Sequence, residues 1–275
     1  MLTFSSQKNI DSSDPSVATT ILDVCYGIDP AQTMDIYLPS NRSCSFTKLL
    51  AIIHGGGFNS GSKADLNIYL RSMQQLLPDY AFFNIDYRMA TNRETLFPTQ
   101  ENDVNAAVKF IVNNSNAFHI SEKLVLLGVS AGGTLALLQG YKYFSPTPAK
   151  AVISFFGPTD LRELYKQTPN PLVSLTLELV TGKKPEEDEL IYANSSPINF
   201  VDINSPPTML LQGGLDPIVH SDQPISLITK LNAAGVINQL VLYPTEGHGW
   251  VGANPFDSFD KVQVFLSANV NCNLF

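Results

Sequence analysis

One serine of this chain lies in a pattern that is typical of a nucleophile. Ser130 is the centre of the sequence GVSAG at 128–132, which follows an apolar run at 124–127 and precedes a helical pattern at 133–143. A G-x-S-x-G sequence between a strand and a helix forms a sharp, strained turn that exposes the serine hydroxyl above a sheet. An ordinary turn is the alternative. We predict that Ser130 is the nucleophile of an acyl-transfer reaction.

A glycine-rich run could supply hydrogen-bond donors for the same reaction. Residues 54–58 read HGGGF and follow another apolar run. Preorganised backbone N–H groups stabilise a developing oxyanion, and a helix N-terminus also favours negative charge. The expected donors of this oxyanion hole are the N–H groups of Gly56, Gly57 and Ala131. A dinucleotide-binding loop is the competing interpretation, but Ser60 stands where that motif requires its third glycine.

A serine hydroxyl needs a general base, and the chain contains four histidines. His248 lies in the sequence EGHGW after the last expected strand and is the predicted base. His220 competes for this role, although one short segment would then supply both the base and its acid partner. His54 belongs to the glycine run. His119 lies between an expected helix and strand, on the side away from the carboxyl ends of the strands.

The base in turn needs a carboxylate that fixes its orientation and stabilises its charged form. Asp216 follows an expected strand in the sequence GGLDP and precedes the histidine loop, so it is the predicted acid. Asp160, after the preceding strand, is the alternative. Glu246 is too close to His248 in the sequence to be aimed at it easily. The predicted catalytic residues are therefore Ser130, Asp216 and His248.

These residues must be positioned by an α/β fold, because apolar runs alternate with helical patterns along the chain. The prediction is a mostly parallel central sheet flanked by helices, in which the first two strands form an antiparallel edge. Helices are expected at 62–77, 98–113, 133–143 and 259–270. Strands are expected at 19–26, 34–38, 48–54, 81–87, 123–127, 149–156, 207–212 and 239–243.

Residues 158–205 interrupt this alternation with two expected helices, at 171–181 and 185–193, and no strand. We assign this segment to a small helical cap inserted in a single domain that spans residues 1–275. Phe58 and Trp250 are candidate residues of the substrate pocket, as are three cap leucines, although each could equally be an ordinary core residue. The cap leucines are Leu172, Leu175 and Leu179.

Composition restricts the class of protein. The 275 residues are 44% hydrophobic and 15% charged, which is typical of a globular chain. The net charge of −8, with scattered Lys and Arg, argues against nucleic acid as a partner. No apolar run approaches the roughly 20 residues that span a bilayer. Residues 1–15 show no secretory signal, which favours the cytoplasm, with secretion after signal removal as the alternative.

The three cysteines are Cys25, Cys44 and Cys272. They are too few and too widely spaced for a disulfide framework or a CxxC metal site. We interpret them as structural or incidental, and a bridge between Cys44 and Cys272 would require an oxidising compartment. The sequence also contains no H-E-x-x-H motif or comparable cluster of metal ligands.

Taken together, these motifs resemble the α/β-hydrolase superfamily, near the HGGG-bearing esterases related to hormone-sensitive lipase and the bacterial acetyl or feruloyl esterases. The resemblance spans most of the chain and includes the order serine, aspartate, histidine. It implies a serine carboxylesterase that forms an acyl-enzyme intermediate, needs no cofactor and acts on a small-molecule ester, with Tyr87, Arg88 and Asp103 as scaffold. Val129 is a departure, because relatives of hormone-sensitive lipase often carry an acidic residue there. The motifs lie at 54–58, 86–88, 97–103, 128–133, 196–197, 215–217 and 247–249.

Two other functions fit parts of the sequence. Residues 192–214 look like those of smaller-capped carbohydrate-ester and formamide hydrolases, so formylkynurenine-like amide hydrolysis is the alternative reaction. A catalytically silent small-molecule receptor is a further alternative, but such relatives usually lack a member of the triad.

Because the cap is short and carries four acidic residues at 186–189, we expect a preference for short acyl groups.

Overall fold

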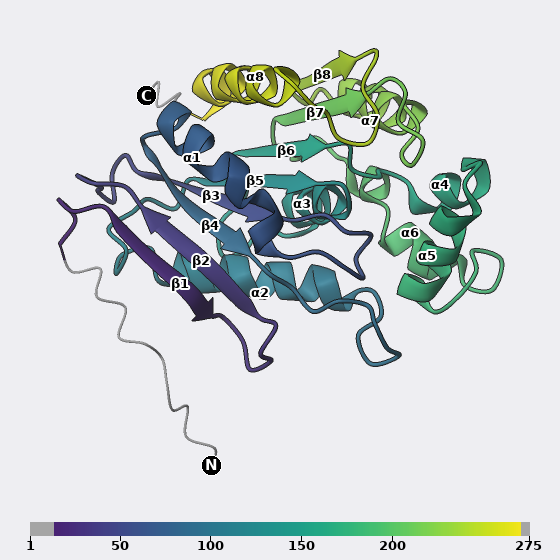
Figure 1. Ribbon diagram of the computed structural model, residues 1–275, viewed down its shortest axis with the longest axis horizontal. Coiled ribbons are helices and arrows are strands. Elements are labelled where there is room, and N and C mark those ends of the chain that lie inside the picture. The colour runs from purple at the N-terminus through teal and green to yellow at the C-terminus, as the bar shows by residue number, and fades with distance from the viewer. Residues whose placement is uncertain (1–13, 271–275) are drawn as a thin grey trace.

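The computed structural model describes residues 14–270, which form an α/β fold around one sheet (Figure 1). Its strand order is β1-β2-β4-β3-β5-β6-β7-β8; β2 pairs antiparallel with both β1 and β4, and the other neighbours are parallel. Every predicted strand is present, with ends within two residues of those expected, and the predicted fold class is confirmed. The strands are β1 Thr19–Cys25, β2 Thr33–Leu38, β3 Lys48–Ile53, β4 Tyr80–Ile85, β5 Leu124–Val129, β6 Ala151–Phe155, β7 Thr208–Gly213 and β8 Asn238–Tyr243.

Helices cover both faces of this sheet (Figure 1). Successive side chains of a strand point to opposite faces, so Leu49, Ala51 and Ile53 of β3 pack into one core cluster while Leu50 and Ile52 pack into another. A parallel strand that is covered on both faces is apolar throughout. One face carries α2 Thr99–Asn113, α3 Ala131–Lys142 and α7 Asp222–Ala233, and the other carries α1 Asn67–Leu76 and α8 Asn254–Asn269.

Two of these helices begin about five residues away from the expected positions, and α7 was not among the helices expected. The helix expected from residue 62 is divided into a short 3-10 helix, Lys63–Leu66, and α1. The last helix, α8, begins at Asn254 rather than at Phe259. Pro255 lies in its first turn, where proline is tolerated because the N–H group that it lacks has no partner within the helix. This proline is a start signal that the sequence interpretation missed.

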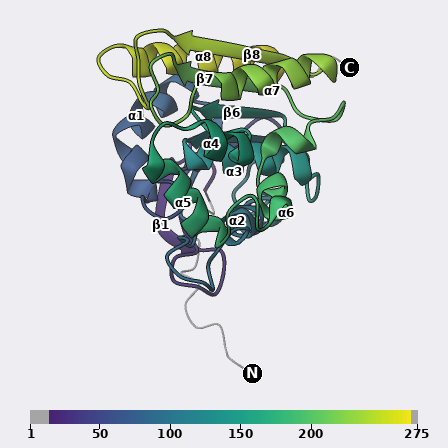
Figure 2. The ribbon, with the colours of Figure 1, turned by 90° about the vertical axis from the view of Figure 1, so that its right-hand side faces the viewer.

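The segment between β6 and β7 contains more helix than expected and lies at one end of the sheet, on the side that Figure 2 shows. Its helices are α4 Leu161–Gln167, α5 Pro171–Thr181 and α6 Glu189–Asn194, followed by a 3-10 helix at Pro197–Phe200. They pack on a cluster of their own, which contains Leu161, Leu164, Leu177 and Tyr192.

The expectation of two helices in this segment was therefore wrong in two respects. Helix α4 was missed, because it has only seven residues and too little periodicity to be recognised. The helix expected at 185–193 begins only at Glu189, because residues 185–187 form a turn and Asp188 caps the helix by accepting a hydrogen bond from the N–H of Ile191 at 3.0 Å. Aspartate is favoured at this capping position.

Part of the predicted single domain of residues 1–275 lies outside the described range, namely residues 1–13 and 271–275. Cys272 is among them, so its expected relation to Cys44 lies outside the described residues as well. Between residues 14 and 270, no helix has the length and apolar character that crossing a membrane requires.

Candidate active site

Ser130 lies at the tight turn between β5 and α3. Its backbone angles are φ 54° and ψ −122°, a combination that residues other than glycine rarely adopt. The N–H of Ser130 donates to the carbonyl oxygen of Phe155 at 2.8 Å, which ties the turn to the end of β6. The turn lies at the carboxyl ends of the parallel strands, where α/β folds place their ligand sites.

Close backbone packing explains the glycine that follows this serine. A Cβ atom on Gly132 would lie 2.2 Å from the carbonyl oxygen of Ile53 and 2.4 Å from that of His54. Side chains cannot approach backbone atoms so closely, so only glycine lets the first turn of α3 touch the end of β3. This contact brings Ser130 beside the glycine run that begins at Gly55.

The three predicted catalytic residues form one hydrogen-bonded chain. Ser130 Oγ lies 2.8 Å from Nε2 of His248, and Nδ1 of His248 lies 2.8 Å from Oδ2 of Asp216. Their loops follow β5, β8 and β7, which end at the same edge of the sheet. The side chain of Asp216 is fully buried and that of His248 is 16% exposed, so the charged end of the chain is shielded from water while the histidine still faces the cleft.

Asp216 is held by four hydrogen-bond donors. Its Oδ1 accepts from the N–H groups of Ile218 and Val219 at 2.8 and 2.9 Å, and its Oδ2 accepts from Nε2 of Gln212 at 3.0 Å as well as facing His248. Burial alone would raise the pKa of Asp216, but the hydrogen bond and charge of His248, with the backbone donors, lower it overall. The carboxylate therefore stays ionised beside the imidazole.

The alternative histidines lie elsewhere. His220 is exposed, and its Nδ1 lies 3.2 Å from a carboxylate oxygen of Asp222. His119 lies between α2 and β5, at the opposite end of β5 from Ser130. His54 is fully buried against the ring of Tyr87, with the centroids 4.4 Å apart. Of the four histidines, His248 is the one that the structure brings to the serine.

The alternative acids also have other partners. Asp160 caps α4 by accepting hydrogen bonds from two backbone N–H groups of its first turn, both at 3.0 Å. Glu246 accepts a hydrogen bond from the side-chain amide of Asn254. These contacts assign both carboxylates to loop and helix structure near the site, whereas Asp216 contacts the histidine.

The glycine run forms a tight turn along one wall of the cleft. Gly56 has φ 111°, and a Cβ atom on it would lie 2.0 Å from the carbonyl oxygen of Ser60, so the turn requires glycine there. The carbonyl oxygen of Gly56 accepts hydrogen bonds from the N–H groups of Asn59 and Ser60 at 3.2 and 3.0 Å. All three expected oxyanion donors, Gly56, Gly57 and Ala131, line the cleft that contains Ser130 and His248.

His54, the first residue of this run, is held in place by hydrogen bonds to its neighbours. Its Nδ1 lies 2.7 Å from the carbonyl oxygen of Gly55, and its own carbonyl oxygen accepts a hydrogen bond from the hydroxyl of Tyr87 at 3.1 Å. Burial lowers the pKa of His54, against the opposing effects of the Gly55 carbonyl and of nearby Asp86. A neutral ring with its proton on Nδ1 satisfies this geometry.

Arg88 and Asp103, which the resemblance marked as scaffold, form an ion pair in which Asp103 is buried and Arg88 is half-buried. The carboxylate accepts from Nη2 and Nε of Arg88 at 2.6 and 2.9 Å, and from its backbone N–H at 2.9 Å. The side-chain amide of Gln32 adds a fourth hydrogen bond at 2.7 Å. This cluster joins the segment after β4 to α2 and does not contact Ser130.

The cleft above Ser130 has a volume of about 660 Å³ and is bordered by the glycine run, the histidine loop and α5. Phe58 lines it, as expected, although the side chain is only 2% exposed and packs edge-on against Phe97. Of the three cap leucines, Leu172 lines the cleft. Leu175 and Leu179 are not among its lining residues; Val173, Thr176 and Leu177 line it instead.

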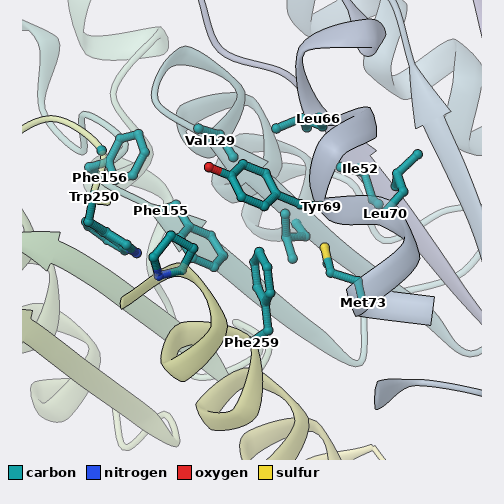
Figure 3. A pocket seen from close by; sticks show the side chains of 13 residues that line it. Ile52, Leu66, Tyr69, Leu70, Met73, Val129, Phe155, Phe156, Trp250 and Phe259 are labelled. Atoms are coloured by element: carbon teal, nitrogen blue, oxygen red, sulfur yellow. The ribbon is translucent and has the colours of Figure 1, made fainter. Parts of the chain in front are cut away.

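Trp250 lines an adjoining cavity rather than this cleft (Figure 3). Sequence reasoning missed Gln212 and Phe156, whose ring lies 4.7 Å from that of His248. A signal for both existed, because Gln212 lies near the end of β7 and Phe156 directly follows β6, at the sheet edge that carries the other site residues.

Among residues 14–270, no group of three or more His, Cys, Asp or Glu side chains is arranged to hold a metal ion.

Curated relatives share moderate sequence identity with this chain. The "Esterase LipC" of Mycobacterium tuberculosis (strain ATCC 25618 / H37Rv) is 25% identical over 261 residues, which is 89% of this chain and 64% of LipC. The "Isoprenylcysteine alpha-carbonyl methylesterase ICME" of Arabidopsis thaliana is 25% identical over 241 residues, which is 82% of this chain and 55% of that protein. The chain thus spans less than two thirds of the length of these relatives.

Solved structures share the fold. A "Truncated form of carbohydrate esterase from gut microbiota" has a TM-score of 0.79 at 23% identity, over 93% of this chain and 98% of that one. A "Bacterial Heroin Esterase" has a TM-score of 0.74 at 22% identity, over 96% and 87% of the two chains. A family model described as BD-FAE matches residues 34–231, which is more than half of the sequence. The chain therefore has the α/β-hydrolase fold and belongs to the BD-FAE family.

Proposed function

We propose that this protein is a serine hydrolase of the carboxylesterase type, which cleaves esters through an acyl-enzyme intermediate on Ser130. The observation that carries the proposal is the hydrogen-bonded chain from Ser130 Oγ through His248 to Asp216, with two contacts of 2.8 Å. Such a chain activates a hydroxyl that is otherwise a poor nucleophile. The names of the relatives, an esterase and a methylesterase, support the same class of reaction.

In this mechanism Ser130 Oγ attacks the ester carbonyl carbon and its proton passes to Nε2 of His248. The former carbonyl oxygen becomes an oxyanion, which the N–H groups of Gly56, Gly57 and Ala131 stabilise. Collapse of the tetrahedral intermediate breaks the bond to the alcohol oxygen, which takes the proton from His248. Water then attacks the acyl-enzyme by the same route, and the carboxylic acid and free Ser130 are released.

Asp216 keeps the imidazole in the productive tautomer. Its carboxylate accepts a hydrogen bond of 2.8 Å from the Nδ1–H group of His248, which leaves Nε2 free to take the serine proton. When His248 becomes positively charged, the nearby ionised carboxylate stabilises that charge. Asp216 therefore acts by orientation and electrostatics, without itself taking a proton.

We assign the segment between β6 and β7 to a small cap and expect it to favour short acyl groups. Helix α5 contributes four lining residues at one side of the cleft, and among them Leu172 is 67% exposed. A long acyl chain gains about 0.8 kcal/mol for each methylene only where it is buried, and an exposed wall buries little. The comparisons give no support to the alternative of formamide hydrolysis.

Replacement of the serine tests the proposed function. Ser130→Ala should fold normally but reduce kcat for p-nitrophenyl acetate by roughly 10³-fold or more, since only the oxyanion donors and binding remain. Ser154→Ala is the matched control, because the buried hydroxyl of Ser154 has no hydrogen-bond partner and its loss should leave activity unchanged. A Ser130→Ala enzyme that keeps more than about a tenth of kcat would contradict the proposal.

A further inference from the structure

A second cavity lies beside the cleft, between α1, α8 and the sheet (Figure 3). Its volume is about 120 Å³. The indole N–H of Trp250 in its wall is already used in a hydrogen bond to Ser258 Oγ at 2.9 Å, which leaves the hydroxyl of Tyr69 as the polar side-chain group of the lining. The cavity is therefore suited to a hydrocarbon group. Its aromatic walls are Tyr69, Phe155, Phe156, Trp250 and Phe259.

This cavity shares part of its wall with the cleft. Leu66, Tyr69, Val129 and Phe156 line both spaces, and all four are half-buried. The deeper walls of the cavity are buried core residues; Leu70, for example, is 5% exposed. The cavity is thus a recess that adjoins the cleft and reaches into the core, with these four side chains between the two spaces.

The recess lies on the histidine side of the nucleophile. Gly249 and Trp250, which directly follow His248, form part of its wall, and the ring of Phe156 contacts the ring of His248. The glycine run at 55–57, in contrast, lines the cleft and not the recess. The two sides of Ser130 therefore differ, with expected oxyanion donors on one side and an apolar recess on the other.

This asymmetry bears on the orientation of a bound ester. The leaving oxygen must lie close to Nε2 of His248, which gives it a proton, whereas the carbonyl oxygen must face the backbone donors. A group attached to the leaving oxygen accordingly points along the side of His248. Val129, which lies in the wall of the recess directly before Ser130, is apolar, and the lining contains no charged side chain, so the recess offers no ion-pair partner to a cationic alcohol.

We propose that the recess is a subsite for the alcohol part of the ester and that it binds a short alkyl group. This inference rests on the proposed function. An engineered apolar cavity of about 150 Å³ holds a benzene molecule, so a recess of about 120 Å³ has room for a somewhat smaller group, such as a chain of about four carbons. The acyl chain then occupies the larger cleft beneath α5.

The test compares kcat/KM for methyl, ethyl, n-propyl, n-butyl and n-hexyl acetate. In the wild type the value should rise about fourfold for each added methylene up to n-butyl, because each one is buried in the recess. Leu70→Phe fills the recess and should reduce the ratio of n-butyl to methyl acetate by about tenfold, while methyl acetate hydrolysis stays within about threefold. Met73→Ala enlarges the recess and should move the optimum to n-hexyl acetate.

Leu77→Ala is the matched control, because Leu77 is buried in the same core cluster but does not line the recess. It should leave the ratio between the acetates unchanged, which separates subsite effects from general loss of stability. A parallel series of methyl acetate, methyl butyrate and methyl hexanoate varies the acyl chain, and its ratios should be the same in the wild type and in both recess variants.

The outcomes separate this inference from the proposed function. If the wild type hydrolyses none of the esters, the proposed function fails. If all the esters are hydrolysed but neither recess variant changes the ratio of n-butyl to methyl acetate, the subsite is refuted while the esterase activity stands. If the recess variants change the acyl series instead of the alcohol series, the recess binds the acyl chain and the assignment to the alcohol is overturned.

Discussion

Gln212 donates a hydrogen bond from Nε2 to Oδ2 of Asp216 at 3.0 Å, the same carboxylate oxygen that faces His248. The amide also donates to the carbonyl oxygen of Val219 at 2.8 Å, and the side chain is 1% exposed. One amide therefore fixes both the carboxylate and the loop that follows β7. In a buried environment such a charge-assisted hydrogen bond is strong, and its loss leaves polar groups without partners.

We predict that Gln212 is a positioning residue whose loss reduces turnover more than substrate binding. Gln212→Leu should lower kcat by about 10-fold to 100-fold, the equivalent of about 1.5 to 3 kcal/mol for a hydrogen bond to a charged group, with KM little changed. The measurement is steady-state kinetics with p-nitrophenyl acetate. Gln139→Leu, which removes another buried amide far from the site, controls for stability. A kcat within twofold of the wild type would refute this role.

The pH dependence of stability should reflect His54. Burial lowers its pKa below the ordinary value of 6.5, so below pH 6.5 the unfolded chain binds a proton that the folded chain does not. The free energy of unfolding therefore falls as the pH decreases, by at most about 1.4 kcal/mol per pH unit from this group. Thermal unfolding at pH 7.5 and 5.5 measures the effect.

His54→Asn keeps a donor near the position of Nδ1 but cannot be protonated, so its Tm should fall less between these pH values than that of the wild type. His119→Asn is the control, because His119 is half-buried and has φ 55°, which asparagine tolerates. An equal fall in Tm for the wild type and His54→Asn would show that protonation of His54 does not limit stability at low pH.

Most of the fold and the central chain of three residues could be predicted from the sequence. Continuous apolar runs identify strands buried on both faces, and GVSAG after such a run places Ser130 at the edge of the sheet. Once the sheet is parallel, loops after different strands must meet at one edge. That rule brings His248 and Asp216 to the edge that carries Ser130, where His248 contacts both of the other residues at 2.8 Å.

The parts that escaped prediction depend on packing rather than on local pattern. Gln212 looks like any residue of an apolar strand, and only the folded loop after β7 brings Asp216 within reach of its amide. Trp250 could not be assigned to one cavity or another, because the position of α8 decides which space it faces. Helix α4 is too short for its periodicity to be read, and its cap at Asp160 was instead considered as an acid partner.

Close packing at the turn that carries Ser130 gives a prediction about stability. Gly132→Ala would place a methyl group 2.2 Å from the carbonyl oxygen of Ile53, so it should lower the free energy of unfolding by about 3 kcal/mol or more, or prevent folding. Gly247→Ala is the control next to His248, since the nearest neighbours of the added methyl group would lie 4.0 Å away. Soluble yield and Tm report both. Equal Tm values for the two variants would contradict the packing argument.

The proposed acyl preference can be measured with nitrophenyl esters of increasing chain length. We expect kcat/KM to be highest for acetyl or butyryl esters and to fall for octanoyl and palmitoyl esters, because the exposed wall at α5 buries few methylenes at about 0.8 kcal/mol each. Leu172→Ala should change the series little, since that side chain is already 67% exposed. A maximum at octanoyl or longer would instead indicate a deep acyl channel.

Covalent labelling of the nucleophile tests the central claim most directly. The wild-type protein and His248→Ala are treated with diethyl p-nitrophenyl phosphate, whose phosphoryl group is transferred to an activated serine, and the modified residue is located by peptide mass spectrometry. We predict one diethylphosphoryl group on Ser130 of the wild type, formed in step with the loss of esterase activity, and little labelling of His248→Ala, because the serine then lacks its base. Inactivation with the label on another residue, or full activity with Ser130 modified, would contradict the account.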